Sequence, residues 1–320
     1  MYMSYINDKL INALKKNHAG KRTAVNTLMD ILPMGREAAY RRLRGEIPFT
    51  LDEAAVICKK FNLSFDRLVY GDDKELYDYQ LQALFLKDPL GEFCRMLTEI
   101  ATGIEEISTD PHSFSYRAYR ALPAEFFGRY DSISKVYLYI LFYQLKPTEI
   151  PGKMADMRLP RKIYDIQAQA ADALLNIDST IILDKHIVED FIGIVKYFSF
   201  MGLLEKKEVA QIKADLFRLI DDLEKCASAG ESPFGKKTDI YISNISFDAT
   251  YSYIEGAGIK SSSVTVFCVD YLSCRNPDVL ESQRLWIRSL IRFSTQISVS
   301  GEFQRNQYFT QQRHLVDTML

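Results

Sequence analysis

The chain has 320 residues, of which 47% are hydrophobic and 26% are charged, and its formal net charge is −2. This composition is typical of a soluble globular protein and excludes a chain that is disordered over most of its length. The longest apolar run, residues 136–143, is much shorter than the roughly 20 residues that span a bilayer. Because the N-terminus also lacks the apolar core of a signal peptide, we expect a cytoplasmic protein with no membrane partner.

Charge is distributed unevenly along the chain. Residues 1–71 contain 12 Lys and Arg against 7 Asp and Glu, a balance of +5, so the rest of the chain carries −7. A basic first part on an acidic body favours a polyanionic partner that contacts the first part alone.

The first seventy residues predict a cluster of short helices, in which apolar residues recur at helical spacing. Residues 33–35, Pro-Met-Gly, interrupt the pattern between the second helix and the third. Thr50 and Glu53 form a capping box at the start of the fourth helix. The five helices are expected at residues 4–17, 22–32, 36–44, 50–61 and 64–71.

Two helical parts are expected to follow this cluster. Residues 72–110 are interpreted as a helical connector or dimerisation segment, with helices near 74–87 and 89–107. Residues 111–230 are interpreted as a mostly helical body, which ends at a Gly- and Pro-containing break. The long helices of this body are expected at residues 161–176, 184–202 and 205–228.

Residues 231–320 are predicted to form an α+β part. The β-rich segments 238–254 and 261–273 flank the turn Glu-Gly-Ala-Gly and predict an antiparallel hairpin within residues 238–273. Helices near 277–294 and 301–318 follow the hairpin. The expected fold class is therefore mainly α with a smaller α+β part, made of an N-terminal five-helix domain (1–71), a central helical region and a C-terminal hairpin packed with helices.

Ten aromatic residues lie between residues 114 and 143. They are interpreted as core or subunit interface, and the alternative is an apolar ligand pocket. Arg117, Arg120 and Arg129 lie among them. These arginines are expected either to meet an anionic ligand or to pair with the acidic surface.

The second and third helices, with the tight turn between them, have the pattern of a helix-turn-helix. Leu28 and Leu32 would pack against Ala39, Tyr40 and Leu43. The arginines of the third helix would then point outward, where a guanidinium can bind guanine O6 and N7 together. The candidate DNA-binding residues are Lys21, Arg22, Arg36, Glu37, Tyr40, Arg41, Arg42 and Arg44.

Residues 5–71 resemble the Cro/repressor, or XRE-type, helix-turn-helix family. The resemblance rests on GREAAYRRLRGE for the recognition helix and on TLDEAAVICKKFNLSFDRLV for the helices after it. It implies binding to the DNA major groove, usually by a homodimer on a palindromic operator. Arg36 and Arg41 are the first candidates for base edges, followed by Arg42, whereas Arg44 and Lys21 are expected to reach phosphates. The C-terminal segment from Trp286 resembles bacterial, Bacteroidetes-type regulators with uncharacterised bodies.

No motif in the chain predicts catalysis, a cofactor or a metal site. The turn EGAGIKSSS does not satisfy the phosphate-loop pattern, and HIVED at residues 186–190 lacks the second histidine of a zinc site. The five cysteines are odd in number and form no Cys-x-x-Cys, so buried free thiols are expected.

The leading hypothesis is a sequence-specific transcriptional regulator that binds double-stranded DNA as a homodimer. Residues 111–320 would then dimerise and bind a small-molecule or protein signal. The first alternative is an antitoxin-like or anti-activator-like protein-binding module whose DNA binding is autoregulatory. The second alternative is an enzyme fused to a helix-turn-helix, which would need a polar cleft with perturbed carboxylates or histidines.

Overall fold

The computed structural model describes residues 3–16, 21–61, 63, 65–70, 79–82, 88–145, 152–266 and 268–320. The chain divides into two compact units, Met1–Leu76 and Tyr77–Leu320. Each unit has its own hydrophobic core, and the two are described separately.

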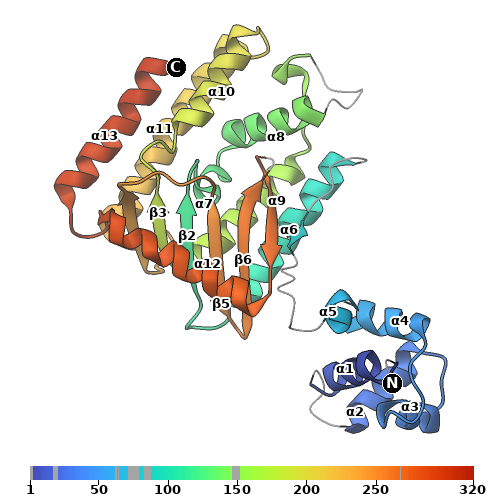
Figure 1. Cartoon of the computed structure of the whole chain (residues 1–320). Coiled ribbons are helices and arrows are strands. Elements are labelled where there is room, and N and C mark those ends of the chain that lie inside the picture. The colour runs from blue at the N-terminus through green and yellow to red at the C-terminus, as the bar shows by residue number, and fades with distance from the viewer. Residues whose placement is uncertain are drawn as a thin grey trace. The chain divides into compact units, whose positions relative to one another are not determined.

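The described part of the first unit consists of short helices (Figure 1). The helices are α1 (Met3–Lys16), α2 (Lys21–Ile31), α3 (Arg36–Leu43), α4 (Leu51–Phe61) and α5 (Phe65–Tyr70). Each differs from the sequence-based bounds by no more than a residue at either end. Local periodicity and capping determine helix ends, which explains why the sequence located them well.

The core of this unit is built from apolar side chains at helical spacing. Leu28 on α2 is fully buried, and Ala39 and Leu43 on α3 lie one turn apart on the same buried side. Burying a leucine of this kind contributes roughly 1.5–3 kcal/mol. The expected packing of α2 on α3 is confirmed, because the cluster contains Leu28, Leu32, Ala39 and Leu43, with Tyr40 packed against it.

The second unit is built on one mixed sheet of eight strands, in the order β1-β7-β6-β5-β2-β3-β4-β8. β2, β3 and β4 run parallel, and the other pairs are antiparallel. The strands are β1 (Gln80–Leu81), β2 (Phe114–Tyr119), β3 (Asp178–Leu183), β4 (Thr238–Ser243), β5 (Tyr251–Gly256), β6 (Ile259–Val266), β7 (Asp270–Cys274) and β8 (Ser294–Gln296).

Helices cover both faces of this sheet (Figure 1). α12 (Pro277–Leu290) lies on one face, where its Ile287 packs against Ala118 and Ile182. The opposite face carries the larger core, which includes Ile181 and Leu183 of β3. The helices that contribute to this core are α6 (Pro89–Ser108), α7 (Ala124–Phe127), α8 (Asp131–Leu145), α9 (Arg161–Leu175), α10 (Glu189–Phe200), α11 (Lys206–Ala229) and α13 (Glu302–Met319).

The sheet is larger than the sequence predicted. β2 and β3 lie in residues 111–230, the stretch expected to be mostly helical. They pair in one sheet with strands from residues 231–320, which the sequence analysis placed in a separate part. The expected hairpin is confirmed only for β5 and β6, because β4 pairs with β3 and not with β5. The sequence of β3, DSTIIL, lacks a clear alternation of apolar and polar residues, and the strands that pair with β2 and β3 are distant in sequence.

Two helix predictions also need correction. Residues 80–81 form β1, although a helix was expected over 74–87; the remainder of that range lies mostly outside the described residues. The helix expected over 184–202 begins only at Glu189. The backbone N–H of Asp184 donates a hydrogen bond to the carbonyl of Tyr119, which continues the β2–β3 pairing past β3 and delays the helix.

The aromatic residues between 114 and 143 mostly fill the core, as the first interpretation expected. Tyr119, Phe126, Tyr137 and Tyr139 are all buried in the large cluster. All five cysteines are free; three are buried, Cys94 is half-buried and Cys268 is exposed, which corrects the expectation for that thiol. Among the described helices, none is both long enough and apolar enough to cross a membrane.

Candidate nucleic-acid interface

α2 and α3 are joined by four residues, Leu32 to Gly35. The N–H of Leu32 bonds to the carbonyl of Leu28, which continues the last turn of α2. Gly35 then takes an extended conformation and caps α3, accepting a bond from the N–H of Ala39 at 3.0 Å. The connection therefore changes the chain direction within a few residues and starts the basic helix immediately.

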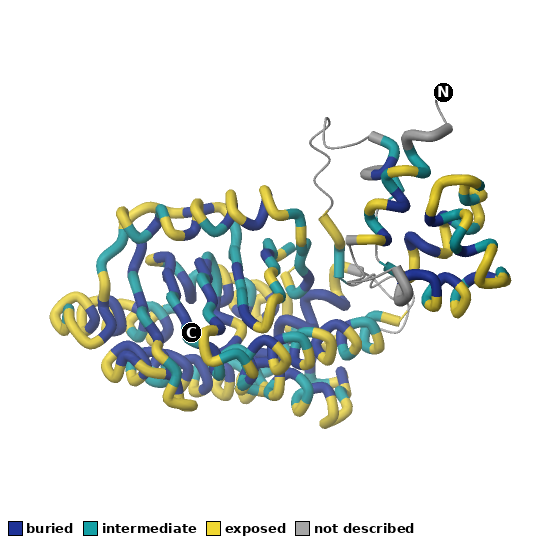
Figure 2. The backbone as a smooth tube through the Cα atoms, turned by 90° about the horizontal axis from the view of Figure 1, so that it is seen from below, coloured by how far each residue is buried: buried dark blue, intermediate teal, exposed yellow. Residues whose placement is uncertain are grey.

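Buried and exposed residues alternate along the helices of the protein (Figure 2), and α3 has one buried side and one exposed side. Ala39 and Leu43 are buried, and Tyr40 is half-buried beside them. Arg36, Glu37, Arg41 and Arg44 are exposed. Since residues four apart lie on one face of a helix, Arg36, Tyr40 and Arg44 follow one line along the surface.

α3 ends in a tight glycine turn. Gly45 has a φ of +79°, a conformation that favours glycine. Its N–H bonds to the carbonyl of Arg42, and the N–H of Glu46 bonds to that of Arg41. This pair of bonds is a Schellman motif, which ends the helix directly after its last arginine.

Arg42 occupies a different place from the other arginines. Its Nη2 and Nε lie 2.7 and 3.0 Å from the two carboxylate oxygens of Glu53 on α4, and its side chain is only 15% exposed. Glu53 also accepts the N–H of Thr50 and donates its own N–H to the Thr50 hydroxyl, so the expected capping box is confirmed. Arg42 therefore joins α3 to the start of α4 and does not belong to the outward set.

The outward arginines have weak surface partners. Arg41 lies 3.4 Å from Glu46, and Arg44 contacts both Glu46 at 2.6 Å and Glu37 at 3.3 Å. The hydrogen bond from Arg44 lowers the pKa of Glu46 from its ordinary value. Arg36 contacts Asn26 at 3.4 Å. The side chains of Arg41 and Arg44 are about half exposed and are accessible to a ligand.

The remaining candidates fall into two groups. Glu37 has a side chain that is 77% exposed next to the arginines, and Tyr40 is half-buried between them and the core. Lys21 and Arg22 form the first residues of α2, but their side chains lie outside the described part of the structure.

The other candidate residues of the sequence make local contacts. Nδ1 of His186 lies 2.6 Å from Oε1 of Glu189 at the start of α10. The backbone N–H of His186 donates a hydrogen bond to the carboxylate of Asp184. Of the described residues, no three His, Cys, Asp or Glu side chains are grouped so that they could hold a metal ion. Arg117 pairs with Glu125, Arg120 with Asp190 and Arg129 with Asp172. Of the two expectations for these arginines, the contacts agree with pairing to acidic groups and not with an anion site.

The described residues of the first unit thus form five short helices, of which α3 exposes a set of arginines. Residues 3–90 match the sequence profile of a family described as the BetR domain, and this stretch is similar to that family. The match includes all of α1–α5 and ends in the first turn of α6. The chain matched no curated protein and no solved structure in the comparisons made.

Proposed function

We propose that this protein is a sequence-specific DNA-binding transcriptional regulator in which α2 and α3 form a helix-turn-helix and α3 enters the major groove. The observation that supports this most is the two-sided character of α3. Its apolar side is buried against α2, while Arg36, Arg41 and Arg44 extend from the other side. An α-helix fits the width of the major groove, where arginine can bind guanine through two hydrogen bonds.

The exposed arginines differ in what they can reach. Arg36 stands in the first turn of α3, the part of a recognition helix that contacts base edges in this geometry. Arg41 is one of the last residues of the helix and is also a base-edge candidate, whereas Arg44 at the C-terminal end suits a phosphate. Glu37 could accept a hydrogen bond from cytosine N4.

The surface ion pairs of α3 do not oppose this proposal. Exposed pairs contribute about 0–1 kcal/mol each, so Glu46 releases Arg41 and Arg44 at little cost. A phosphate or a guanine edge then replaces the carboxylate as the partner. The pairs keep the side chains extended on the surface before DNA binds.

A homodimer is part of the proposal. Two copies related by a two-fold axis would place two α3 helices in successive major grooves, about 10 base pairs apart on a palindromic site. The second unit, Tyr77–Leu320, is the candidate for dimerisation, since it holds most of the chain.

The deciding experiment is selection of bound sequences from a random duplex pool by the full-length protein at about 150 mM salt, a condition that suppresses nonspecific retention. An enriched palindrome with a fixed half-site spacing is expected. Weak retention without enrichment, sensitive to salt alone, would contradict a sequence-reading role.

A protein-binding role is the second candidate. It is favoured by apolar side chains exposed on α12 and just after it, where Leu285 is 53% and Phe293 is 51% exposed. Exposed apolar groups of this kind often mark protein interfaces. The mass of the purified complex separates the two roles, since a regulator is expected as two identical chains and a protein-binding module as a complex with a different chain.

A further inference from the structure

A large cavity lies in the second unit, between the sheet and the helices that cover its larger core. Its volume is about 860 Å³, which falls in the range of small-molecule sites. The floor comes from β2, β5, β6 and β7, and the wall from α6, α9 and α10. Protein interiors are normally close-packed, so a space of this size is either filled by a ligand or by water.

The floor of the cavity carries a row of hydroxyl groups. The strand register places Arg117 opposite Ser252, Ser252 opposite Ser263, and Ser263 opposite Ser273, and all four line the cavity. Neighbouring strands lie about 4.8 Å apart, so the three serines span about 10 Å. On the other side of Arg117 the same row continues with Ile181 and Ile240, which are buried in the core.

Most of these hydroxyls have room for a partner. Ser273 accepts a hydrogen bond from Gln82 at 2.6 Å. Ser252 and Ser263 make no side-chain hydrogen bond with any residue that the structure describes. These two serines are half-buried, so their hydroxyls remain available to a ligand in the cavity.

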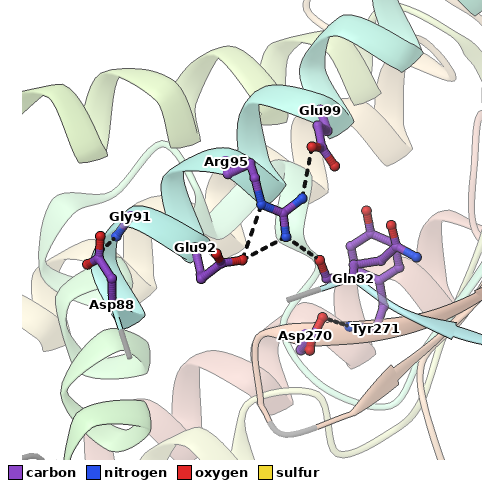
Figure 3. A network of polar contacts seen from close by, with 8 residues as sticks. All are labelled: Gln82, Asp88, Gly91, Glu92, Arg95, Glu99, Asp270 and Tyr271. Atoms are coloured by element: carbon purple, nitrogen blue, oxygen red, sulfur yellow. Dashed lines mark hydrogen bonds and ion pairs between the residues drawn. The ribbon is translucent and has the colours of Figure 1, made fainter. Parts of the chain in front are cut away.

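The wall that faces this row is apolar. Met96, Leu97, Ile100 and Ile104 of α6 line it. Arg95 holds this wall to the sheet edge, since it donates to the carbonyl of Gln82 at 2.8 Å and pairs with Glu92 and Glu99 (Figure 3). Water can bond to the serine row of the floor, but the apolar residues of this wall offer it no hydrogen bonds.

The inner end of the cavity is polar but electrically balanced. Arg117 is 1% exposed and lies 2.9 Å from Glu125, which also accepts the hydroxyl hydrogen of Tyr119. Burial raises the pKa of Tyr119 well above its ordinary value, so the hydroxyl stays protonated. Within the described part of the chain, Nε of Arg117 and Oε1 of Gln167 have no hydrogen-bond partner, and both residues line the cavity.

We propose that this cavity binds a neutral amphipathic small molecule. Its apolar body would pack on α6, and hydroxyl or carbonyl groups along one edge would bond to Ser252 and Ser263. Arg117 and Gln167 close the inner end of the site, where their atoms without partners are themselves buried. An anion is disfavoured because Arg117 is neutralised by Glu125 and Arg120 by Asp190. The third arginine of the lining, Arg275, is outnumbered by the carboxylates of Glu99, Glu106, Asp248 and Asp270.

The test uses N-phenylnaphthylamine, a neutral fluorescent probe of apolar sites, titrated into the full-length protein. Saturable fluorescence enhancement is expected. Gly103 lines the cavity on α6, and a side chain added there meets open space. Gly103→Phe should therefore fill part of the cavity and weaken probe binding by about ten-fold or more.

A matched control is available on α10. Gly193 is also a helical glycine with open space at its Cβ position, but it is exposed and does not line the cavity. Gly193→Phe should leave probe binding unchanged. Ser263→Leu, on the opposite side of the cavity, provides a second filling variant should Gly103→Phe fail to fold. Absence of saturable binding, or equal binding by the filling variants and the wild type, would overturn the proposal.

Competition between ligands of equal chain length identifies the polar group. Decanol should displace the probe better than decanoate or decyltrimethylammonium, and the double variant Ser252→Ala/Ser263→Ala should weaken decanol by about three-fold or more. Better displacement by decanoate would overturn the neutral class. These measurements contain no DNA, so failure here leaves the DNA-binding proposal intact, and failure to select an operator leaves the cavity proposal intact.

Discussion

The guanidinium of Arg42 on α3 and the carboxylate of Glu53 on α4 form two parallel hydrogen bonds, and each side chain is less than one-fifth exposed. The same carboxylate completes the capping box with Thr50. One arginine of a basic helix therefore connects two helices of the fold, while its neighbours stay exposed at the surface. The two roles predict different consequences of substitution.

Arg42→Ala should lower the free energy of unfolding of the first unit by about 1–3 kcal/mol, because it leaves a partly buried carboxylate without its partner. Hydrogen-exchange mass spectrometry of α3 and α4 peptides in the full-length chain measures this. Arg44→Ala is the control, since its exposed pairs should contribute little. Equal loss of protection in both variants would contradict the assignment.

The Arg42–Glu53 pair also predicts a pH dependence. Hydrogen bonds from Arg42 lower the pKa of Glu53 below its ordinary value. A lowered carboxyl pKa stabilises the folded state above the unfolded pKa of about 4.3, and this contribution is lost as the pH falls through the folded pKa. The stability difference between wild type and Glu53→Gln should therefore shrink as the pH decreases below about 4.3.

Circular dichroism melting over a pH series measures this difference. Glu37→Gln is the matched control, because the Glu37 side chain is 77% exposed. A stability difference between wild type and Glu53→Gln that stays constant with pH would show that the charge of Glu53 does not cause the stabilisation.

Arg41→Ala should weaken binding to the selected operator by about 1–3 kcal/mol if Arg41 contacts a guanine, and should relax the preference at that position. Its effect on stability should be small, since its ion pair with Glu46 lies at the surface. Lys59→Ala removes one exposed charge from α4 and serves as the control for net charge. Equal losses of operator affinity in the Arg41→Ala and Lys59→Ala variants would show that Arg41 acts through net charge and does not contact a base.

Lys21→Ala tests the phosphate contact expected at the start of α2. It should weaken binding to operator and random DNA alike, because a phosphate contact carries no sequence information. The slope of log affinity against log salt should become shallower by about one. A change confined to the operator would instead indicate that Lys21 contacts a base.

The buried Arg117–Glu125 pair predicts a context-dependent effect in the second unit. Arg117→Met should destabilise this unit by about 3–5 kcal/mol, because Glu125 is then buried without a compensating charge. The double variant Arg117→Met/Glu125→Gln should recover much of the loss. Urea unfolding followed by Trp286 fluorescence reports on this unit alone, since Trp286 is the only tryptophan of the chain. A double variant no more stable than the single one would contradict this account.

The sequence by itself determined most helix positions, the capping box at Thr50 and the division of α3 into a buried and an exposed side. These features depend on residues within about one or two helical turns of each other, so local periodicity and capping are sufficient. It also separated the basic first part from the acidic body by charge count alone.

Only the tertiary structure decided which strands form the sheet and which arginine of α3 pairs with a carboxylate on another helix. β2 pairs with β3 and β5, which lie far from it in sequence, and Arg42 is oriented by a carboxylate on another helix. The hydroxyl row arises in the same way, because Ser252, Ser263 and Ser273 align only through strand register. Register depends on pairing between distant segments, and no local pattern in one strand specifies its partner.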